Sequence, residues 1–398
     1  MTEKLWTKNF LLIIWSYALM YGGFHALLPT IPVYAAQNGG TGTQLGIIGG
    51  IFGISAIIIR FFAVWGAKKI GGKNCLLIGL VVSFLSMIGY SIFFRVDEII
   101  AIRTIHGFGY GLATTFFATL ATDIIPRSRR GEGMGYFGLG STAVMVVAPA
   151  FGVWVANSYS FDIMFTITAA SQLAAILLLF CMTSVATAAA VPAKQDGTSI
   201  LDNLIEKGLM FPAFLTMLFG VGYGSVNIFV AMVAQEAHIV NPGYFFFVGA
   251  ICIFLSRPIA GKVFDRKGPA WVILPGAVFL FFGLFIISKT TSLTLFLIAG
   301  VCYGFGGGLL LPSLLTWMIN LARPDHKTGA SVTFYNAIDI GTCGGSFLLG
   351  IIAEQIGYTH MYLYSTASMG IFMVAFIIYC ILHSSHLQQT LDVRDSEN

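Results

Sequence analysis

The sequence is poor in charged residues, which make up only 10% of its 398 positions. Soluble domains are typically about a quarter charged, because charged side chains cover much of a water-facing surface. The 17 acidic and 21 basic residues present here are too few to cover a soluble fold of this length. This shortage argues against a soluble enzyme, a nucleic-acid-binding protein and a disordered chain.

Motifs for metal, nucleotide and catalytic chemistry are also missing. The six cysteines stand singly within apolar runs without CxxC spacing, so we interpret them as small core residues. The sequence has no Walker motif, which argues against an ATP-driven pump. It also lacks the paired acids or HExxH of an intramembrane enzyme. We therefore expect a protein that is not an enzyme, with no catalytic residue, no metal and no cofactor.

Long apolar runs fill most of the chain, and 57% of all residues are hydrophobic. A helix needs about 20 apolar residues to cross a bilayer. Twelve such runs occur between residues 9 and 382, and they lack the alternation of a transmembrane barrel. The expected fold class is an all-α polytopic membrane protein with twelve transmembrane helices.

The longest polar interruption divides these runs into two sets of six. We expect an N-terminal six-helix bundle at 1–182, a cytoplasmic linker at 183–208, a C-terminal six-helix bundle at 209–382 and a cytoplasmic tail at 383–398. With the N-terminus inside, the inner loops hold sixteen Lys and Arg residues and the outer loops hold two. The positive-inside rule then predicts that both termini are cytoplasmic.

The two halves resemble each other at a fixed spacing. Gly107-Phe-Gly-Tyr-Gly111 recurs as Gly304-Phe-Gly-Gly-Gly308, and Arg60 recurs as Arg257, both at an offset of 197 residues. Parallel repeats of six helices are typical of transporters that hold a solute near the bilayer midplane. The repeat therefore favours two pseudo-symmetric bundles that alternate access to one solute.

Four segments resemble motifs of the major facilitator superfamily. Gly261-Lys-Val-Phe-Asp265-Arg266-Lys-Gly268 is similar to its GxxxDRxG loop, and Arg103-Thr-Ile-His106-Gly107-Phe-Gly109 is similar to its RxxxGxG motif. Leu28-Pro29-Thr-Ile-Pro32 and Pro149-Ala-Phe-Gly152 resemble motifs of the twelve-helix drug:proton antiporter branch. The resemblance implies the fold of that superfamily.

The same resemblance implies a conformational latch on the cytoplasmic side. Its expected members are Gly261, Asp265, Arg266 and Gly268, with Lys68 and Lys69 in the first half. A carboxylate such as that of Asp265 can accept the free N–H groups of a facing helix, and we expect the two glycines to permit close packing. The first half departs from the family pattern because Lys68 replaces an Asp. The alternative is a charged loop that only sets topology.

Four residues are candidates for proton coupling: Asp339, Arg103, His25 and His106. Asp339 lies about ten residues into its apolar run, where it is either a group that gains and loses a proton or a hydrogen-bonded structural Asp. An arginine inside a membrane helix normally faces a cavity or a partner, and the alternative is that it reaches the headgroups. The resemblance links this arginine to proton movement. Imidazole titrates near neutral pH, although a lone His is more often structural.

Stripes of aromatic and polar residues are the expected walls of a solute cavity. Tyr17, Tyr21 and His25 recur every four residues and so share one helix face, and this stripe is repeated by Tyr223 and Asn227. The full set of expected wall residues is Tyr17, Tyr21, His25, Tyr110, Thr114, Phe219, Tyr223, Asn227, Tyr303 and Trp317.

These observations favour a secondary transporter that exports a small organic solute in exchange for protons, with the proton gradient as the driving force. A proton-coupled symporter or a facilitator for nutrient uptake is the alternative, because the motifs do not encode direction. The expected partners are a small-molecule solute, protons and the lipid bilayer. Nothing in the sequence demands more than a monomer, and the compact loops favour a bacterial inner membrane.

Overall fold

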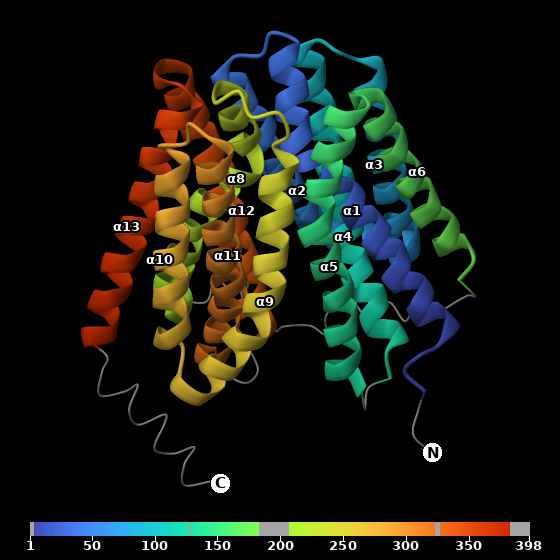
Figure 1. Ribbon diagram of the computed structural model, residues 1–398. Helices are drawn as coiled ribbons and strands as arrows, with labels where there is room; N and C mark the ends of the chain where they lie inside the picture. The colour runs from blue at the N-terminus through green and yellow to red at the C-terminus, as the bar shows by residue number, and fades with distance from the viewer. Residues whose placement is uncertain (1–3, 127–128, 183–206, 323–326, 383–398) are drawn as a thin grey trace, which may run out of the picture. The chain divides into compact units, whose positions relative to one another are not determined.

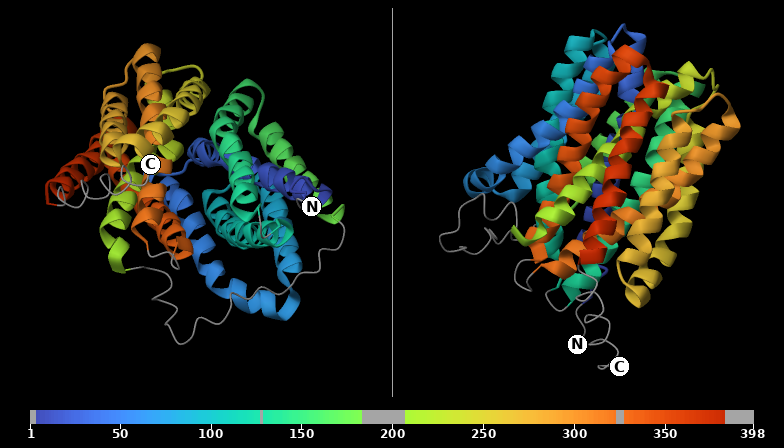
Figure 2. Two further views of the ribbon diagram at one scale, coloured as in Figure 1. Left: turned by 90° about the horizontal axis from the view of Figure 1, so that it is seen from below. Right: turned by 90° about the vertical axis from the view of Figure 1, so that its left-hand side faces the viewer.

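Two helical units make up the chain in the computed structural model, which describes residues 4–126, 129–182, 207–322 and 327–382. One compact unit is Met1–Gly197 and the other is Thr198–Asn398. Within each unit the helices run roughly alongside one another (Figures 1 and 2). The predicted tail, and the predicted linker apart from Lys207 and Gly208, lie outside the described residues. Their boundaries therefore stay predictions.

Six long helices form the first unit, and six more form the second after a short 3-10 helix at Lys207–Leu209. The helices of the first unit are α1 (Lys8–Gln37), α2 (Gly42–Ile70), α3 (Gly72–Ile92), α4 (Val96–Ile124), α5 (Arg130–Ser158) and α6 (Phe161–Phe180). Those of the second unit are α8 (Met210–Glu236), α9 (Gly243–Lys267), α10 (Ala270–Ile287), α11 (Leu293–Leu321), α12 (Lys327–Ile356) and α13 (Tyr358–Leu382). The described residues contain no strand, which confirms the predicted all-α fold.

Eleven of the twelve long helices carry an apolar stretch long enough to cross a membrane. The remaining one, α4, is 29 residues long, but Asp97, Glu98 and Arg103 lie among its first eight residues. It packs between α2 and α3, which both belong to the apolar set. The chain is therefore a multi-pass membrane protein.

Side-chain caps and glycines determine where several helices begin and end. Thr7, Ser160 and Ser292 each accept a backbone N–H at the start of α1, α6 and α11, which stabilises those helix ends. α2 is followed by Gly71 at φ 85° and α9 by Gly268 at φ 87°, a conformation that glycine adopts without strain from a Cβ atom. Gly71 and Gly268 are 197 residues apart, so the repeat includes the geometry of these helix ends.

The two units use the same pairs of packed helices. In the first unit, α1 packs against α5 and α6, α4 packs against α2 and α3, and α3 packs against α6. In the second unit, α8 packs against α12 and α13, α11 packs against α9 and α10, and α10 packs against α13. When α1 to α6 are matched in order with α8 to α13, each packed pair of the first unit corresponds to a packed pair of the second. The expected pseudo-symmetric six-helix bundles are thus present.

Close contacts at glycines follow the same offset. A Cβ atom built at Gly107 would collide with the carbonyl oxygen of Phe52, and one built at Gly304 would collide with the carbonyl oxygen of Gly249. Residues 52 and 249 are again 197 positions apart. Glycine is needed on α4 and α11 because each helix meets a neighbouring backbone with no space for a side chain.

Candidate functional site

A polar cluster lies inside the first unit around Arg103 on α4. The Arg103 side chain is only 1% exposed, and its Nε donates to the carbonyl oxygen of Ile48 at 3.4 Å. Its guanidinium carbon lies 4.3 Å from the centre of the Phe52 ring and 5.7 Å from the centre of the Phe24 ring, within the range of cation–π attraction. Arg103 Nη1 has no hydrogen-bond partner among the described residues.

Tyr90 and His106 complete this first-unit cluster. The Tyr90 hydroxyl lies 3.2 Å from His106 Nδ1, and both side chains are buried. The Arg103 guanidinium interacts electrostatically with both groups. A guanidinium, a phenol and an imidazole therefore lie together within the membrane-spanning helices. Tyr90 was not among the expected site residues, because it lies on α3 and no local spacing links it to α4.

The predicted α1 stripe meets the predicted α4 stripe beside this cluster. The Tyr21 ring lies 4.4 Å from the His25 ring and 6.3 Å from the Tyr110 ring, measured between centroids. Phe24 lies 4.3 Å from Tyr110 and also contacts Arg103, so it joins the two stripes. His25 is 8% exposed, and its Nε2 has no hydrogen-bond partner among the described residues. The structure thus brings His25, Tyr21 and Tyr110 close together.

Tyr17 and Thr114 lie at the edge of this group. Tyr17 stacks on Phe137 of α5 with ring centroids 4.6 Å apart, so its ring serves the packing of α1 against α5. The Thr114 hydroxyl donates to the carbonyl oxygen of Tyr110 at 2.9 Å, within its own helix. These contacts give both residues a structural part in the first unit.

A second polar cluster lies inside the other unit. Asn227 Nδ2 donates to the Tyr303 hydroxyl at 3.2 Å and to the carbonyl oxygen of Tyr223 at 2.9 Å. The Tyr223 and Tyr303 rings stack at 5.2 Å with an angle of 17° between their planes. Phe219 also stacks on Tyr223, with ring centroids 5.2 Å apart. Four of the predicted wall residues, from α8 and α11, therefore form one aromatic and polar surface.

Arg257 on α9 belongs to this second-unit cluster, and the sequence analysis did not select it as a site residue. Its guanidinium interacts with the Tyr223 hydroxyl, and its buried Nε has no hydrogen-bond partner among the described residues. It is the fifteenth of the 25 residues of α9, and Pro258 follows it. A charge deep in an apolar helix beside a proline was the available sequence signal, since functional charges in membrane helices have this placement.

Asp339 lies on α12, near a close contact between that helix and α8. A Cβ atom built at Gly341, two residues later, would collide with the carbonyl oxygen of Met217 on α8. Asp339 is partly buried and interacts electrostatically with Tyr335, one turn earlier. The structure thus places this carboxylate within a membrane-spanning helix but on a different helix from the second-unit cluster.

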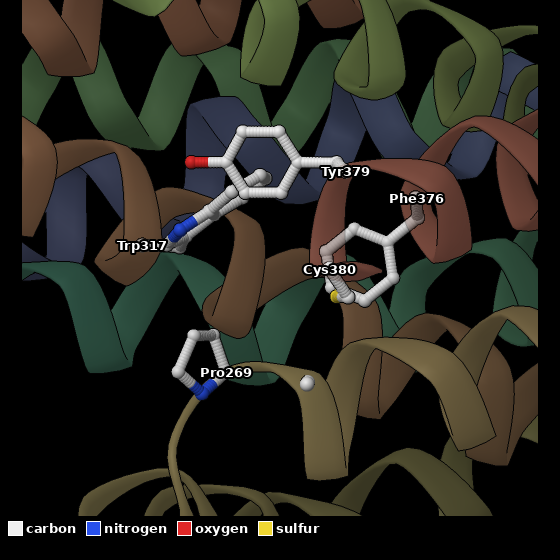
Figure 3. Close-up of a pocket in the computed structure, with 6 residues that line it drawn as sticks. Pro269, Trp317, Phe376, Tyr379 and Cys380 are labelled. Atoms are coloured by element: carbon white, nitrogen blue, oxygen red, sulfur yellow. The ribbon is translucent and has the colours of Figure 1, made fainter. Parts of the chain in front are cut away.

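Trp317 lies apart from the other predicted wall residues. Its ring packs against Phe376 at 5.6 Å and Tyr379 at 5.4 Å on α13. Figure 3 shows it at a small pocket that also includes Pro269 and Cys380. Trp317 follows Tyr303 by fourteen residues on α11, which corresponds to about 20 Å along a helix. The two aromatic residues therefore do not form one wall.

The expected latch residues lie at the ends of α2 and α9. Asp265 and Arg266 are exposed in the last turn of α9, and Lys68 and Lys69 are exposed in the last turn of α2. Basic side chains at this position favour the negative end of the helix dipole. The exposed positions of these four side chains are consistent with charged residues at the ends of two helices.

The close packing expected at Gly261 and Gly268 is not seen among the described residues. No described atom lies within 4 Å of a Cβ atom built at either glycine. The physical requirement at Gly268 is its positive φ, which ends α9, whereas space remains around Gly261.

The described residues contain no group of three or more His, Cys, Asp and Glu side chains that could hold a metal ion. All six cysteines are free thiols, spread over six helices or helix ends. The polar groups with unpartnered nitrogens, Arg103, His25 and Arg257, are suited to bind protons, anions or hydrogen-bond acceptors.

Comparisons with known proteins agree with this arrangement. The sequence profile of the Major Facilitator Superfamily matches residues 13–342. Multidrug resistance protein MdtG of Escherichia coli is 24% identical over 376 residues, which cover 90% of this chain and 91% of that protein.

Two solved structures show the same fold at lower identity. The nucleoside transporter NupG is 14% identical, with a TM-score of 0.73 over 93% of this chain and 99% of that chain. A POT family transporter in complex with a thioalcohol-conjugated peptide is 13% identical, with a TM-score of 0.73 over 95% of this chain and 96% of that chain. The profile match, the paired six-helix units and these fold likenesses lead to one conclusion: the chain belongs to the Major Facilitator Superfamily.

Proposed function

We propose that this transporter exports a small organic solute in exchange for protons. The observation that carries the proposal is the first-unit cluster, in which Arg103, His106 and Tyr90 lie together inside membrane-spanning helices. Charged and titrating groups in the membrane are expensive and mark ion or solute pathways. Imidazole changes its protonation state near physiological pH, which a proton-coupled step requires.

The first-unit cluster can couple protonation of His106 to the position of the Arg103 side chain. A proton on His106 places a second positive charge beside the Arg103 guanidinium, and two adjacent like charges repel. Proton uptake is therefore favoured when Arg103 moves away or when an acceptor approaches its Nη1. In this proposal His25 extends the proton path, and Asp339 supplies a second titrating group in the other unit.

Export is supported by the relationship to MdtG, which is named a multidrug resistance protein. Uptake remains the second candidate, because proteins named as nucleoside and POT family transporters share the fold. We also propose that both termini are cytoplasmic, that the protein acts in a bacterial inner membrane as a monomer, and that Asp265 and Arg266 regulate the change of access. The superfamily consists of transporters, so we assign no catalytic residue and no cofactor.

Everted membrane vesicles provide the test. Respiration acidifies their interior, and a dye reports the pH gradient while each compound of a toxin and metabolite panel is added. A proton-coupled exporter should dissipate the gradient when its solute is present, and cells that overproduce the protein should tolerate that solute better. The Arg103→Ala variant should lose the response and Arg103→Lys should recover part of it, because lysine keeps the charge but not the planar fork.

The Lys289→Ala variant is the matched control, since it removes a positive charge from an exposed loop between α10 and α11. A compound transported at the same rate with and without a pH gradient would contradict proton coupling. A growth defect on one carbon or nitrogen source in cells lacking the protein, without altered toxin sensitivity, would favour uptake.

A further inference from the structure

We propose that the transported solute carries a negatively charged group and that Arg257 binds it. This inference rests on the proposed function, because it specifies the solute of that transporter. Its structural basis is the second-unit cluster, which contains Arg257, Tyr223, Asn227 and Tyr303. The inference assigns the substrate-binding charge to a residue outside the motifs that resemble the superfamily.

Contacts at two adjacent glycines hold this cluster together. A Cβ atom built at Gly307 of α11 would lie 2.9 Å from the ring of Tyr223 on α8. One built at Gly308 would collide with the hydroxyl of Ser256 on α9, the residue before Arg257. Three helices therefore approach one another at a single level. Arg257 follows Ser256 directly in α9, and its guanidinium interacts electrostatically with Tyr223.

The charge of Arg257 has no opposite charge paired with it among the residues that the structure describes in its unit. The structure gives it no ion pair with any described carboxylate of the second unit, and its buried Nε has no hydrogen-bond partner there. An arginine inside a membrane helix is costly unless its charge is compensated. An uncompensated charge of this kind is stabilised when an anion approaches it.

Arg257 also lies well inside α9, away from both ends of the helix. It lies ten residues before Lys267, the last residue of α9, which is about 15 Å along the helix. This distance exceeds the reach of an arginine side chain, so a lipid phosphate at the end of α9 is a poor partner. A solute that enters the protein at membrane depth is the source of negative charge that fits.

The neighbouring groups indicate what else the solute contains. The guanidinium presents N–H donors in a planar fork that matches a carboxylate or phosphate, and the Tyr223 hydroxyl adds a further donor. The Tyr223 ring, which stacks on the buried Phe219 ring, places an apolar aromatic group beside these donors. An organic anion with an apolar or aromatic body matches both features. A cationic solute would meet repulsion at Arg257.

Binding of three matched probes tests this inference without requiring transport. The full chain is placed in nanodiscs of zwitterionic phosphatidylcholine, and its affinity is measured for 4-phenylbutyrate, 4-phenylbutanamide and 4-phenylbutylamine. These compounds share a phenylalkyl body and differ in charge. We expect the carboxylate to bind about tenfold more tightly than the amide, because a charge-assisted hydrogen bond is about twice as strong as a neutral one. The amine should bind most weakly.

The variants show whether Arg257 causes this preference. Arg257→Gln should reduce the ratio of carboxylate to amide affinity to about one, and Arg257→Lys should retain part of it. Arg60→Gln is the matched control, because it removes the same charge from the repeat-related position, and it should keep the full preference. A melting temperature within the wild-type range shows that each variant is folded.

Three outcomes would overturn the inference: equal affinity for all three probes, no binding of the carboxylate at millimolar concentration, or a preference that persists in Arg257→Gln. Failure of the proposed exchange with protons would be a separate result from these binding measurements. It would appear as solute flux that does not depend on the pH gradient. Binding of the carboxylate through Arg257 would stand unchanged in that situation.

Discussion

Asn227 donates a hydrogen bond to the Tyr303 hydroxyl at 3.2 Å, and these two residues occupy the repeat positions of His25 and His106. An amide and a phenol of the second unit therefore stand where the first unit has two imidazoles. The backbone arrangement is shared, while the chemistry of the side chains differs.

Removing the Tyr303 hydroxyl should weaken solute binding while leaving the fold intact. Asn227 Nδ2 retains its bond to the carbonyl oxygen of Tyr223 in Tyr303→Phe, so the amide is not left without a partner. Loss of one neutral hydrogen bond corresponds to about 1 kcal/mol, or about a fivefold rise in KM. Transport kinetics in vesicles measure this change. Tyr244→Phe, at an exposed position of α9, should have wild-type kinetics, and an equal effect of both variants would refute the assignment.

A methyl group at Gly304 should destabilise the second unit. The Cβ atom of Gly304→Ala would collide with the backbone of α9, which must then move, and overpacking of this kind typically costs about 1–3 kcal/mol. Thermal unfolding of the purified protein measures the loss. Gly344→Ala is the matched control, because no described atom lies within 4 Å of its Cβ and alanine favours a helix. A lower melting temperature for Gly344→Ala than for Gly304→Ala would contradict the packing argument.

Glu236 should stabilise the start of α13. Its carboxylate accepts the backbone N–H groups of Tyr358 and Thr359 at 2.7 and 2.8 Å, and also the Thr359 hydroxyl. Glu236→Ala should lower stability by about 1 kcal/mol, the usual effect of losing a helix cap. Its exposed neighbour provides the control variant Gln235→Ala, which should unfold like the wild type. Identical melting curves for the two variants would show that this cap is dispensable.

Asp339 should be required for proton-driven flux. The Asp339→Asn variant keeps the size of the side chain but cannot gain and lose a proton, so flux driven by a pH gradient should stop while the protein stays folded. Vesicle flux at imposed pH gradients measures the effect, with exposed Asp97→Asn as the control. Normal proton-driven flux in Asp339→Asn would remove this carboxylate from the coupling step.

Much of the fold follows from patterns that a single chain carries. The apolar runs predict the long helices, because membrane thickness fixes the length a span needs. The offset of 197 residues predicts that the two units pack their helices in the same way. This is seen at Gly107 and Gly304, which contact repeat-related residues on α2 and α9. The sequence repeat therefore appears in the structure as a repeat of helix packing.

The clusters themselves could be predicted only in part. Tyr21, His25 and Tyr110 share faces that helical periodicity reveals, and the structure brings them together. Tyr90 could not be predicted, because its partners lie on another helix, where packing rather than spacing decides the contact. The prediction groups Trp317 with Tyr303 because both lie on α11. Fourteen residues separate them along the helix, so they lie at different depths and do not line one wall.

The chemical difference between the two clusters has a consequence for the roles of the two units. An imidazole changes its charge across the acidity range met at a bacterial membrane, whereas an amide and a phenol do not. At these two positions the first unit therefore carries side chains that can take up a proton, while the second unit carries side chains that stay neutral. Two changes between repeat-related positions would thus give one level of the two bundles a proton-dependent charge on one side of the repeat only.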